Sequence, residues 1–293
     1  MESFFSFLEK RVDDCSSLLC IGLDPHIPDL KEPSAASARD FCLNLVKQTS
    51  RYAAAFKPNA AFFEVFGADG WTALKDVIDA IQEESDRMGS MIPVVLDAKR
   101  GDIASTAEAY AKSAFESLGV HCITLSPYLG KDSIEPFIQN SEKGVFLLCK
   151  TSNPGSGDLQ DLMVTIDNRP LTMEETSPSI VHGPSSVPLY EHVAKLAQTW
   201  NTKNNIGLIV GATHVDAMRR VRAAAPDLWF LAPGVGVQGG ELESALKAGL
   251  RKDGKGMLIP VSRGIARAEK PGVAAAEFRD QILAIQSSII GNR

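Results

Sequence analysis

Charged side chains stand directly after several short apolar runs of this sequence. Asp24 and Lys57 each end such a run, and Arg263 follows another after one intervening residue. The densest group is Asp97-Ala98-Lys99-Arg100-Gly101-Asp102, a D-x-K-x-x-D motif that follows Ile92 to Leu96. Alternate residues of a strand face the same side, so Asp97 and Lys99 are expected to form an ion pair. Such a pair in a confined site can stabilise developing charge and transfer a proton, whereas a structural salt bridge is the simpler alternative.

The apolar runs themselves predict the elements that bring these charges together. They are continuous rather than alternating, which is typical of strands buried on both faces of a parallel sheet. The eight runs are Leu18 to Asp24, Ala53 to Lys57, Ile92 to Asp97, Val120 to Leu125, Gly144 to Cys149, Ile206 to Val210, Leu228 to Ala232 and Met257 to Val261.

Segments with helical spacing of apolar residues lie between and after the runs. Examples are Phe41, Leu45 and Val46; Leu74, Val77, Ile78 and Ile81; and Phe278, Ile282, Ile285 and Ile289. Eight strand–helix units in 293 residues predict an α/β fold, a (β/α)8 TIM barrel in one domain, rather than a doubly wound sheet. A further helix from Phe4 to Asp14 is expected to close the barrel bottom, while the charged strand ends meet at the opposite rim.

One stretch, residues 153–188, does not fit the alternation of strands and helices. It is rich in Pro, Ser, Gly and Asn, and Val164 to Leu171 has the pattern of a hairpin inserted after the fifth strand. A decorative or oligomer-contacting insertion is one interpretation. A lid is the other, because the segment leaves from the rim where barrel enzymes carry their active sites.

Composition excludes several classes of protein. Thirty Lys and Arg against thirty-six Asp and Glu give a net charge of −6, which disfavours nucleic acid and anionic membranes as partners. No run approaches the roughly eighteen apolar residues of a membrane span, and the start lacks a signal-peptide pattern, so we expect a cytoplasmic protein. The five cysteines form no C-x-x-C pair and are expected to be buried, reduced thiols, and the histidines form no H-x-x-x-H zinc motif.

Three motifs in order resemble the orotidine 5′-monophosphate decarboxylase family. They are Phe56-Lys57-Pro58-Asn59, the D-x-K-x-x-D motif with Ile103 and Thr106, and Pro233-Gly234-Val235-Gly236-Val237-Gln238-Gly239-Gly240. The resemblance spans nearly the whole chain, and the D-A-K-R-G-D-I spelling is similar to the longer-loop subgroup. It implies a homodimeric (β/α)8 barrel that converts orotidine 5′-monophosphate to uridine 5′-monophosphate and CO2 with neither metal nor organic cofactor.

The resemblance also implies a charged array of Lys57, Asp97 and Lys99, completed by Asp102 from the other subunit. Loss of CO2 from C6 leaves an electron pair orthogonal to the π system of the ring, so the site must stabilise the carbanion directly. The ammonium of Lys99 is expected to do this and then to donate the proton, while Asp97 and Asp102 keep it charged and oriented.

The substrate contacts follow from the same resemblance. Asp24 and Asn59 would bind ribose hydroxyls, Ile103 and Thr106 would reach the partner's site, Thr151 or Ser152 would hold the pyrimidine edge, and Gln238 and Arg263 would clamp the phosphate beside Pro233. The planar fork of an arginine suits a phosphate.

Two alternatives remain open at this point. A related barrel decarboxylase or aldolase acting on a sugar phosphate shares D-x-K-x-x-D but uses Mg²⁺, so metal dependence separates it from the first interpretation. A catalytically silent phosphate-binding barrel would have no need for four buried charges at positions 57, 97, 99 and 102. The G-x-G-x-x-G match at Gly234 is a weak sign of dinucleotide binding, because too little chain follows it for a nucleotide-binding sheet.

Overall fold

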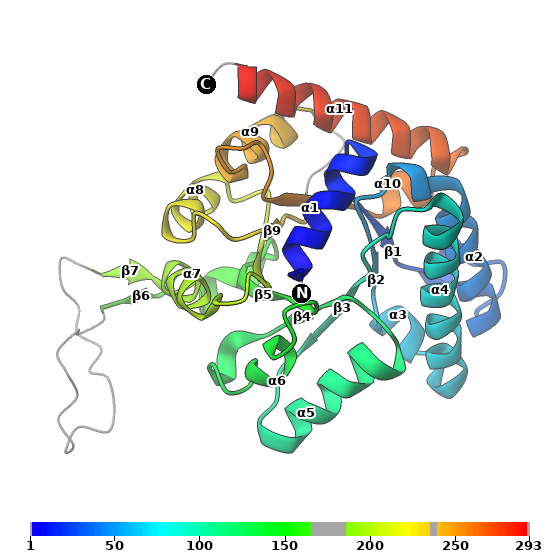
Figure 1. Ribbon diagram of the computed structural model, residues 1–293, viewed down its shortest axis with the longest axis horizontal. Coiled ribbons are helices and arrows are strands. Elements are labelled where there is room, and N and C mark those ends of the chain that lie inside the picture. Colours follow the sequence, from blue (N-terminus) through cyan, green and yellow to red (C-terminus); the bar gives the residue numbers. More distant parts are fainter. Residues whose placement is uncertain (1, 166–185, 235–238, 292–293) are drawn as a thin grey trace.

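The computed structural model describes residues 2–165, 186–234 and 239–291, and parallel strands ringed by helices form its centre (Figure 1). The barrel strands are β1 (Leu19–Leu23), β2 (Ala55–Pro58), β3 (Val95–Arg100), β4 (Cys122–Leu125), β5 (Gly144–Lys150), β8 (Ile206–Val210), β9 (Phe230–Leu231) and β10 (Met257–Val261). Neighbouring strands pair in parallel in the order β2-β1-β10-β9-β8-β5-β4-β3. The predicted (β/α)8 barrel is therefore confirmed.

The barrel closes between β2 and β3 through isolated bridges rather than a continuous ladder. Phe56 pairs with Val94, and Asn59 pairs with Asp97, both in parallel orientation. The Ala60 N–H also donates to the Asp97 carbonyl oxygen at 3.1 Å. Asn59 and Asp97, two residues predicted to belong to the site, thus lie side by side across this seam.

The helices cover the outside of the barrel as their apolar spacing predicts. They are α1 (Phe4–Cys15), α2 (Ala35–Thr49), α3 (Ala61–Glu64), α4 (Gly67–Met88), α5 (Ala104–Lys112), α6 (Glu135–Ile138), α7 (Leu189–Trp200), α8 (Val215–Ala224), α9 (Gly239–Gly249), α10 (Arg263–Ala266) and α11 (Pro271–Gly291). The apolar stripe of α4 is buried from Leu74 to Ile81. That helix ends at Gly89, which adopts φ +63° as a left-handed cap, a conformation that glycine reaches without strain.

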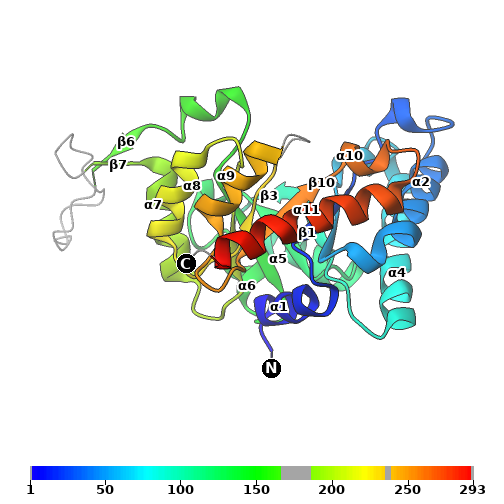
Figure 2. The same cartoon turned by 90° about the horizontal axis from the view of Figure 1, so that it is seen from above.

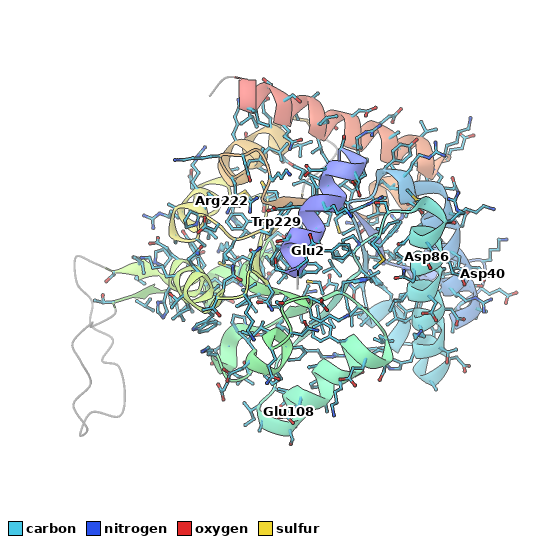
Figure 3. All side chains as sticks on the ribbon, in the orientation of Figure 1. Glu2, Asp40, Asp86, Glu108, Arg222 and Trp229 are labelled. Carbon is cyan, nitrogen blue, oxygen red and sulfur yellow. The ribbon has the colours of Figure 1, made fainter. Side chains whose placement is uncertain are left out.

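Helix α1 closes the end of the barrel where the strands begin, as predicted. Its Phe5 ring stacks on Trp229 with centroids 6.1 Å apart and meets Phe146 edge-on at 5.5 Å. The Trp229 Nε1–H donates to Glu9 at 3.2 Å, and Figure 3 shows Trp229 next to α1. A Cβ on Gly207 would lie 2.6 Å from the Phe146 ring, so the absence of a side chain there makes room for these aromatic rings.

His121, just before β4, makes the stability of this end of the barrel depend on pH. Its Nδ1 accepts the Val94 N–H at 3.2 Å, and burial, aided by the charge of Lys143, lowers its pKa to about 4. The unfolded chain, with a pKa of about 6.5 at this residue, takes up the proton first as the pH falls. The native state is therefore expected to lose about 2 kcal/mol of stability between about pH 7.5 and about pH 5 through this group.

The contribution of His121 is measured by urea unfolding of the wild type and of His121→Asn, each at about pH 7.5 and at about pH 5. The asparagine carbonyl can still accept the Val94 N–H but binds no proton, so the variant should lose less stability on acidification. Asp97 has a pKa of about 3.9 in the unfolded chain and one lowered to about 2 in the native state, so it contributes little change in this window, because both values lie below it. An equal loss in both proteins would contradict the assignment to His121.

The insertion after β5 leaves from the rim opposite α1, as predicted (Figure 2). Its described part contains a 3-10 turn, Pro154–Asp158, and an antiparallel pair of β6 (Met163–Val164) with β7 (Val187–Pro188). The pair extends away from the barrel beside α7 (Figure 1). The hairpin predicted from Val164 to Leu171 lies mostly outside the described residues, and the pairing partner of Val164 is Val187.

Two further expectations concern cysteines and membranes. All five cysteines, Cys15, Cys20, Cys42, Cys122 and Cys149, are buried and free, which confirms the prediction. Among the helices of the described ranges, none combines the length and the apolar character that a membrane span requires.

Candidate active site

The predicted charged array lies at the barrel seam, with the Asp97 carboxylate between two ammonium groups. Its Oδ2 is 2.8 Å from Lys57 Nζ, and its Oδ1 is 2.5 Å from Lys99 Nζ. The side chains of Lys57 and Asp97 are only 8% and 13% exposed, whereas that of Lys99 is 51% exposed. The expectation of four buried charges is thus wrong for Lys99, whose side chain is half exposed at the barrel mouth, and for Asp102, which is only partly buried.

Electrostatics keep the two inner members of the array ionised. Burial lowers the pKa of Lys57, but the nearby charges of Asp24 and Asp97 outweigh it and raise that pKa above its ordinary value. Burial raises the pKa of Asp97, but Lys57 and Lys99 together lower it to about 2. A carboxylate that stays charged between two cations orients both of them, which suits a site where charge develops during a reaction.

The chain leaves regular strand geometry within the D-x-K-x-x-D motif. Lys99 adopts φ +49°, in the left-handed region, and the pairing of β3 with β4 shifts register between Leu96 and Arg100. The prediction that Asp97 and Lys99 meet is confirmed by their ion pair. Alternation along a regular strand does not fully explain this ion pair, because the backbone turns at Lys99.

Two predicted ribose-binding residues flank the array. One carboxylate oxygen of Asp24, Oδ1, is buried and accepts no hydrogen bond from the described residues. A buried acceptor without a donor is costly, so this oxygen is suited to a hydroxyl group that enters the site. Asn59 lies across the seam from Asp97 and accepts the Ala61 N–H through its side chain at 3.2 Å.

The later part of the motif does not join the array within one chain. The side chain of Asp102 accepts the N–H of Ile103 at 2.8 Å and forms no ion pair with a described residue. Ile103, at the start of α5, exposes 53% of its surface, and Thr106 is exposed on the same helix. The structure therefore brings Lys57, Asp97 and Lys99 together but leaves Asp102 outside this array and Ile103 and Thr106 exposed.

The two hydroxyls at the end of β5 have different surroundings. Thr151 is engaged by Gln160, whose Oε1 accepts the Thr151 N–H at 2.9 Å and whose Nε2 donates to Thr151 Oγ1 at 2.9 Å. Ser152 is exposed, and its side chain lies within van der Waals reach of the Cβ positions of Gly211 and Gly234. Among the described residues, the Ser152 hydroxyl has no hydrogen-bond partner, whereas the Thr151 hydroxyl is hydrogen-bonded to Gln160.

Lys150, which the sequence analysis did not single out, holds the base of the insertion. It is 2% exposed, and its Nζ donates to Asp161 at 2.7 Å and to Ser156 at 3.1 Å. The same signal that marked Lys57, a lysine at the end of an apolar run, could have found it. Lys150 thus ties the end of β5 to the side chains of Ser156 and Asp161, while Gln160 holds the backbone just before Ser152 through the Thr151 N–H.

The predicted phosphate clamp is described only in part. Arg263 is exposed at the first residue of α10, two residues beyond the end of β10, and its side chain forms no hydrogen bond or ion pair with the described part of the chain. The Pro233 carbonyl accepts the Ala212 N–H at 2.8 Å, and Gly234 follows it with φ +94°. Gln238 lies outside the described residues.

Metal ligands are a separate question. Over residues 2–165, 186–234 and 239–291, no group of three His, Cys, Asp or Glu side chains is placed to hold a metal ion. The geometry supports electrostatic chemistry, with a half-exposed ammonium beside a mostly buried carboxylate at the open end of a barrel.

Comparisons with known proteins identify the family to which the whole chain is similar. The profile of the family described as "Orotidine 5'-phosphate decarboxylase / HUMPS family" matches residues 17–278. Orotidine 5′-phosphate decarboxylases from Roseiflexus castenholzii and Thermomicrobium roseum are 42% and 41% identical, covering 98% and 99% of this chain and 97% and 98% of their own. The solved structure of Leishmania donovani OMP decarboxylase superposes with a TM-score of 0.81 at 50% identity, covering 97% of this chain and 99% of that one.

Proposed function

This chain belongs to the orotidine 5′-phosphate decarboxylase / HUMPS family, and from that premise we propose which of its residues perform each part of the reaction. The activity is that of a carboxy-lyase, which converts orotidine 5′-monophosphate to uridine 5′-monophosphate and CO2 in pyrimidine synthesis. The observation that carries the assignment of roles is the Lys57–Asp97–Lys99 array at the open rim of the barrel.

The chemical step requires stabilisation of charge at one carbon atom. When the bond between C6 and the carboxylate breaks, its electron pair stays on C6 and CO2 leaves. The Lys99 ammonium, half exposed at the barrel mouth, faces this charge and donates a proton to C6, after which solvent restores its own proton. Asp97 aligns Lys99, and Lys57 fixes Asp97 from the buried side.

Substrate contacts surround the array on neighbouring strand ends. Asp24, whose buried Oδ1 accepts no hydrogen bond from the described residues, and Asn59 bind the ribose hydroxyls. Ser152 binds the pyrimidine edge, because the hydroxyl of Thr151 is already committed to Gln160. Arg263 binds the phosphate, and the loop that begins at Pro233 and contains Gln238 completes this clamp.

We also propose a homodimer in which each site is shared. Asp102 forms no ion pair with Lys99 of its own chain, although the mechanism needs a second carboxylate near that ammonium. Large apolar side chains are exposed where β2, β3 and β4 end, namely Val65, Ile103, Tyr128 and Leu129. A second copy of the chain would cover this patch and bring Asp102, Ile103 and Thr106 to its neighbour's site.

Mixing two inactive variants is expected to restore activity if the sites are shared. A heterodimer of Lys99→Ala and Asp102→Ala carries both defects in one site and none in the other. Random exchange of subunits therefore recovers up to about a quarter of the wild-type sites. Decarboxylation after denaturation and joint refolding measures the recovery, and each variant refolded alone is the control. No recovery after verified exchange would mean that Asp102 acts within its own chain.

The proposed independence from metals distinguishes this activity from the Mg²⁺-dependent sugar-phosphate enzymes of related barrels. Purified protein in chelator-treated buffer should decrease the absorbance of orotidine 5′-monophosphate steadily. A reaction that starts only when Mg²⁺ is added would favour the metal-dependent alternative. No decrease under either condition would favour the silent barrel.

Three wider proposals accompany the reaction. Residues 1–293 form one domain, supported by a single buried cluster that runs from Phe4 to Ile289. Five free, buried cysteines support a reducing compartment, and we place the protein in the cytoplasm. The spelling of the D-A-K-R-G-D-I motif supports the longer-loop subgroup.

A further inference from the structure

Thr124 is a polar residue in the middle of the otherwise apolar strand β4, and it lies directly beside the charged array. The residue is fully buried. Its Oγ1 is 3.0 Å from the Ala98 nitrogen, 2.9 Å from the Lys99 nitrogen and 3.3 Å from Asp97 Oδ1. No other side-chain oxygen among the described residues accepts a hydrogen bond from either of these two N–H groups.

The three contacts use the full hydrogen-bonding capacity of a hydroxyl group. A threonine hydroxyl has two lone pairs and one proton. The lone pairs accept the N–H groups of Ala98 and Lys99, and the proton is donated to the Asp97 carboxylate. One side chain therefore contacts the backbone on the N-terminal side of Lys99 and the carboxylate that holds the Lys99 ammonium.

The backbone at this point has an unusual form that needs such support. Leu96 pairs with Ile123 and Arg100 with Leu125, so residues 97–99 of β3 stand opposite Thr124 alone. Lys99 adopts φ +49° within this bulge. A lysine in the left-handed region is strained, and such strain persists only where the surroundings fix it. The two N–H groups that the bulge removes from the strand ladder are the ones that Thr124 accepts.

We propose that Thr124 is a positioning residue for the decarboxylation, and that its hydroxyl holds the bulge which presents Lys99 to the substrate. The inference rests on the role of Lys99 under the proposed function. Thr124 acts through Asp97 and Lys99 and has no contact of its own with the reacting carbon. Removing the hydroxyl releases the Lys99 backbone and one contact to Asp97, so the ammonium loses its fixed place.

Thr124→Val tests this, because valine keeps the shape of the side chain and removes only the hydroxyl group. We expect kcat to fall by about 10- to 100-fold, the effect of a misplaced catalytic group, while KM for orotidine 5′-monophosphate changes by less than about threefold. The affinity for uridine 5′-monophosphate should be equally unaffected, because ribose and phosphate contacts come from other strands. Thr124→Ser retains the hydroxyl and should keep kcat within about threefold of wild type.

A matched control is Thr49→Val. Thr49 is also fully buried, but its hydroxyl donates to the Leu45 carbonyl within α2, away from the array. Its replacement should change the melting temperature and leave kcat at the wild-type level. Should Thr124→Val fail to fold, Thr124→Ala provides the second hydroxyl-free variant, since it leaves space for water near the two N–H groups.

The outcomes separate this inference from the proposed function. A kcat within about threefold of wild type in a folded hydroxyl-free variant would overturn the positioning role. So would a Thr124→Ser variant as slow as Thr124→Val, because the methyl group and its packing would then be what matters. A wild-type protein that does not decarboxylate orotidine 5′-monophosphate would instead refute the proposed function.

Discussion

Replacing Lys99 by alanine is expected to abolish nearly all decarboxylation and to leave the barrel folded. The lysine ammonium is the proposed proton donor, and alanine has no proton to give. Folding should be preserved because the Lys99 side chain is half exposed and its partner Asp97 keeps the second ion pair with Lys57. Steady-state decarboxylation and thermal unfolding of the same sample measure the two properties.

A matched control exists on the outside of the barrel. Lys75 pairs with Asp79 on α4 at 2.5 Å and is 41% exposed, close to the geometry of Lys99 with Asp97. Lys75→Ala should keep full activity, so a loss confined to Lys99→Ala reports the position and not the general removal of an exposed lysine. If Lys99→Ala keeps more than about a tenth of the wild-type kcat, a barrier change below about 1.4 kcal/mol, Lys99 is not the proton donor.

The strands and helices were predictable because each carries its own signal. Continuous apolar runs identify strands buried on both faces, and the predicted limits of Ile206–Val210 and Met257–Val261 agree with β8 and β10. The predicted C-terminal end came too early where a strand continues into charged residues. β3 extends to Arg100, three residues past the predicted end, because Arg100 still pairs with Leu125 across the bulge.

The bulge itself could not be predicted from the motif. Its hydrogen-bond acceptor, Thr124, is 25 residues from Lys99 in the sequence and comes from another strand. The periodic spacing of apolar residues in helices and strands relates only positions within one element, so it cannot connect Lys99 with Thr124. Thr124, a polar residue inside the run Val120 to Leu125, was the available sign, and its role becomes visible only when β4 is placed beside β3.

The insertion shows a similar limit. Its composition predicted a departure from the barrel pattern, and its position predicted that it leaves from the active-site rim. The pairing of Met163–Val164 with Val187–Pro188 joins segments more than twenty residues apart, which short-range hairpin signals do not reveal. The contacts of Lys150 with Asp161 and of Gln160 with Thr151 span only 11 and 9 residues, but no helical period or strand alternation predicts them either.

Replacing Arg263 by alanine is expected to separate binding of the phosphate from the chemistry at C6. Arg263 begins α10 at the carboxyl end of β10, is exposed, and its side chain has no partner among the residues that the structure describes. Charge-assisted hydrogen bonds contribute about 1.5 to 3 kcal/mol each, so losing two should lower kcat/KM by roughly two to four orders of magnitude. Arg267 lies four residues after Arg263 and forms an ion pair with Asp29, so Arg267→Ala should have little effect on kcat/KM.

Activity on orotidine, a substrate without the phosphate, shows whether Arg263 acts by binding the phosphate. Binding energy from a remote phosphate can align the reacting end of the substrate, so the wild type should already process orotidine poorly. Arg263→Ala should then make that reaction little worse, because the guanidinium has no phosphate to contact. If the variant instead loses as much activity on orotidine as on orotidine 5′-monophosphate, Arg263 supports the barrel or the base, and the phosphate must bind at another strand end.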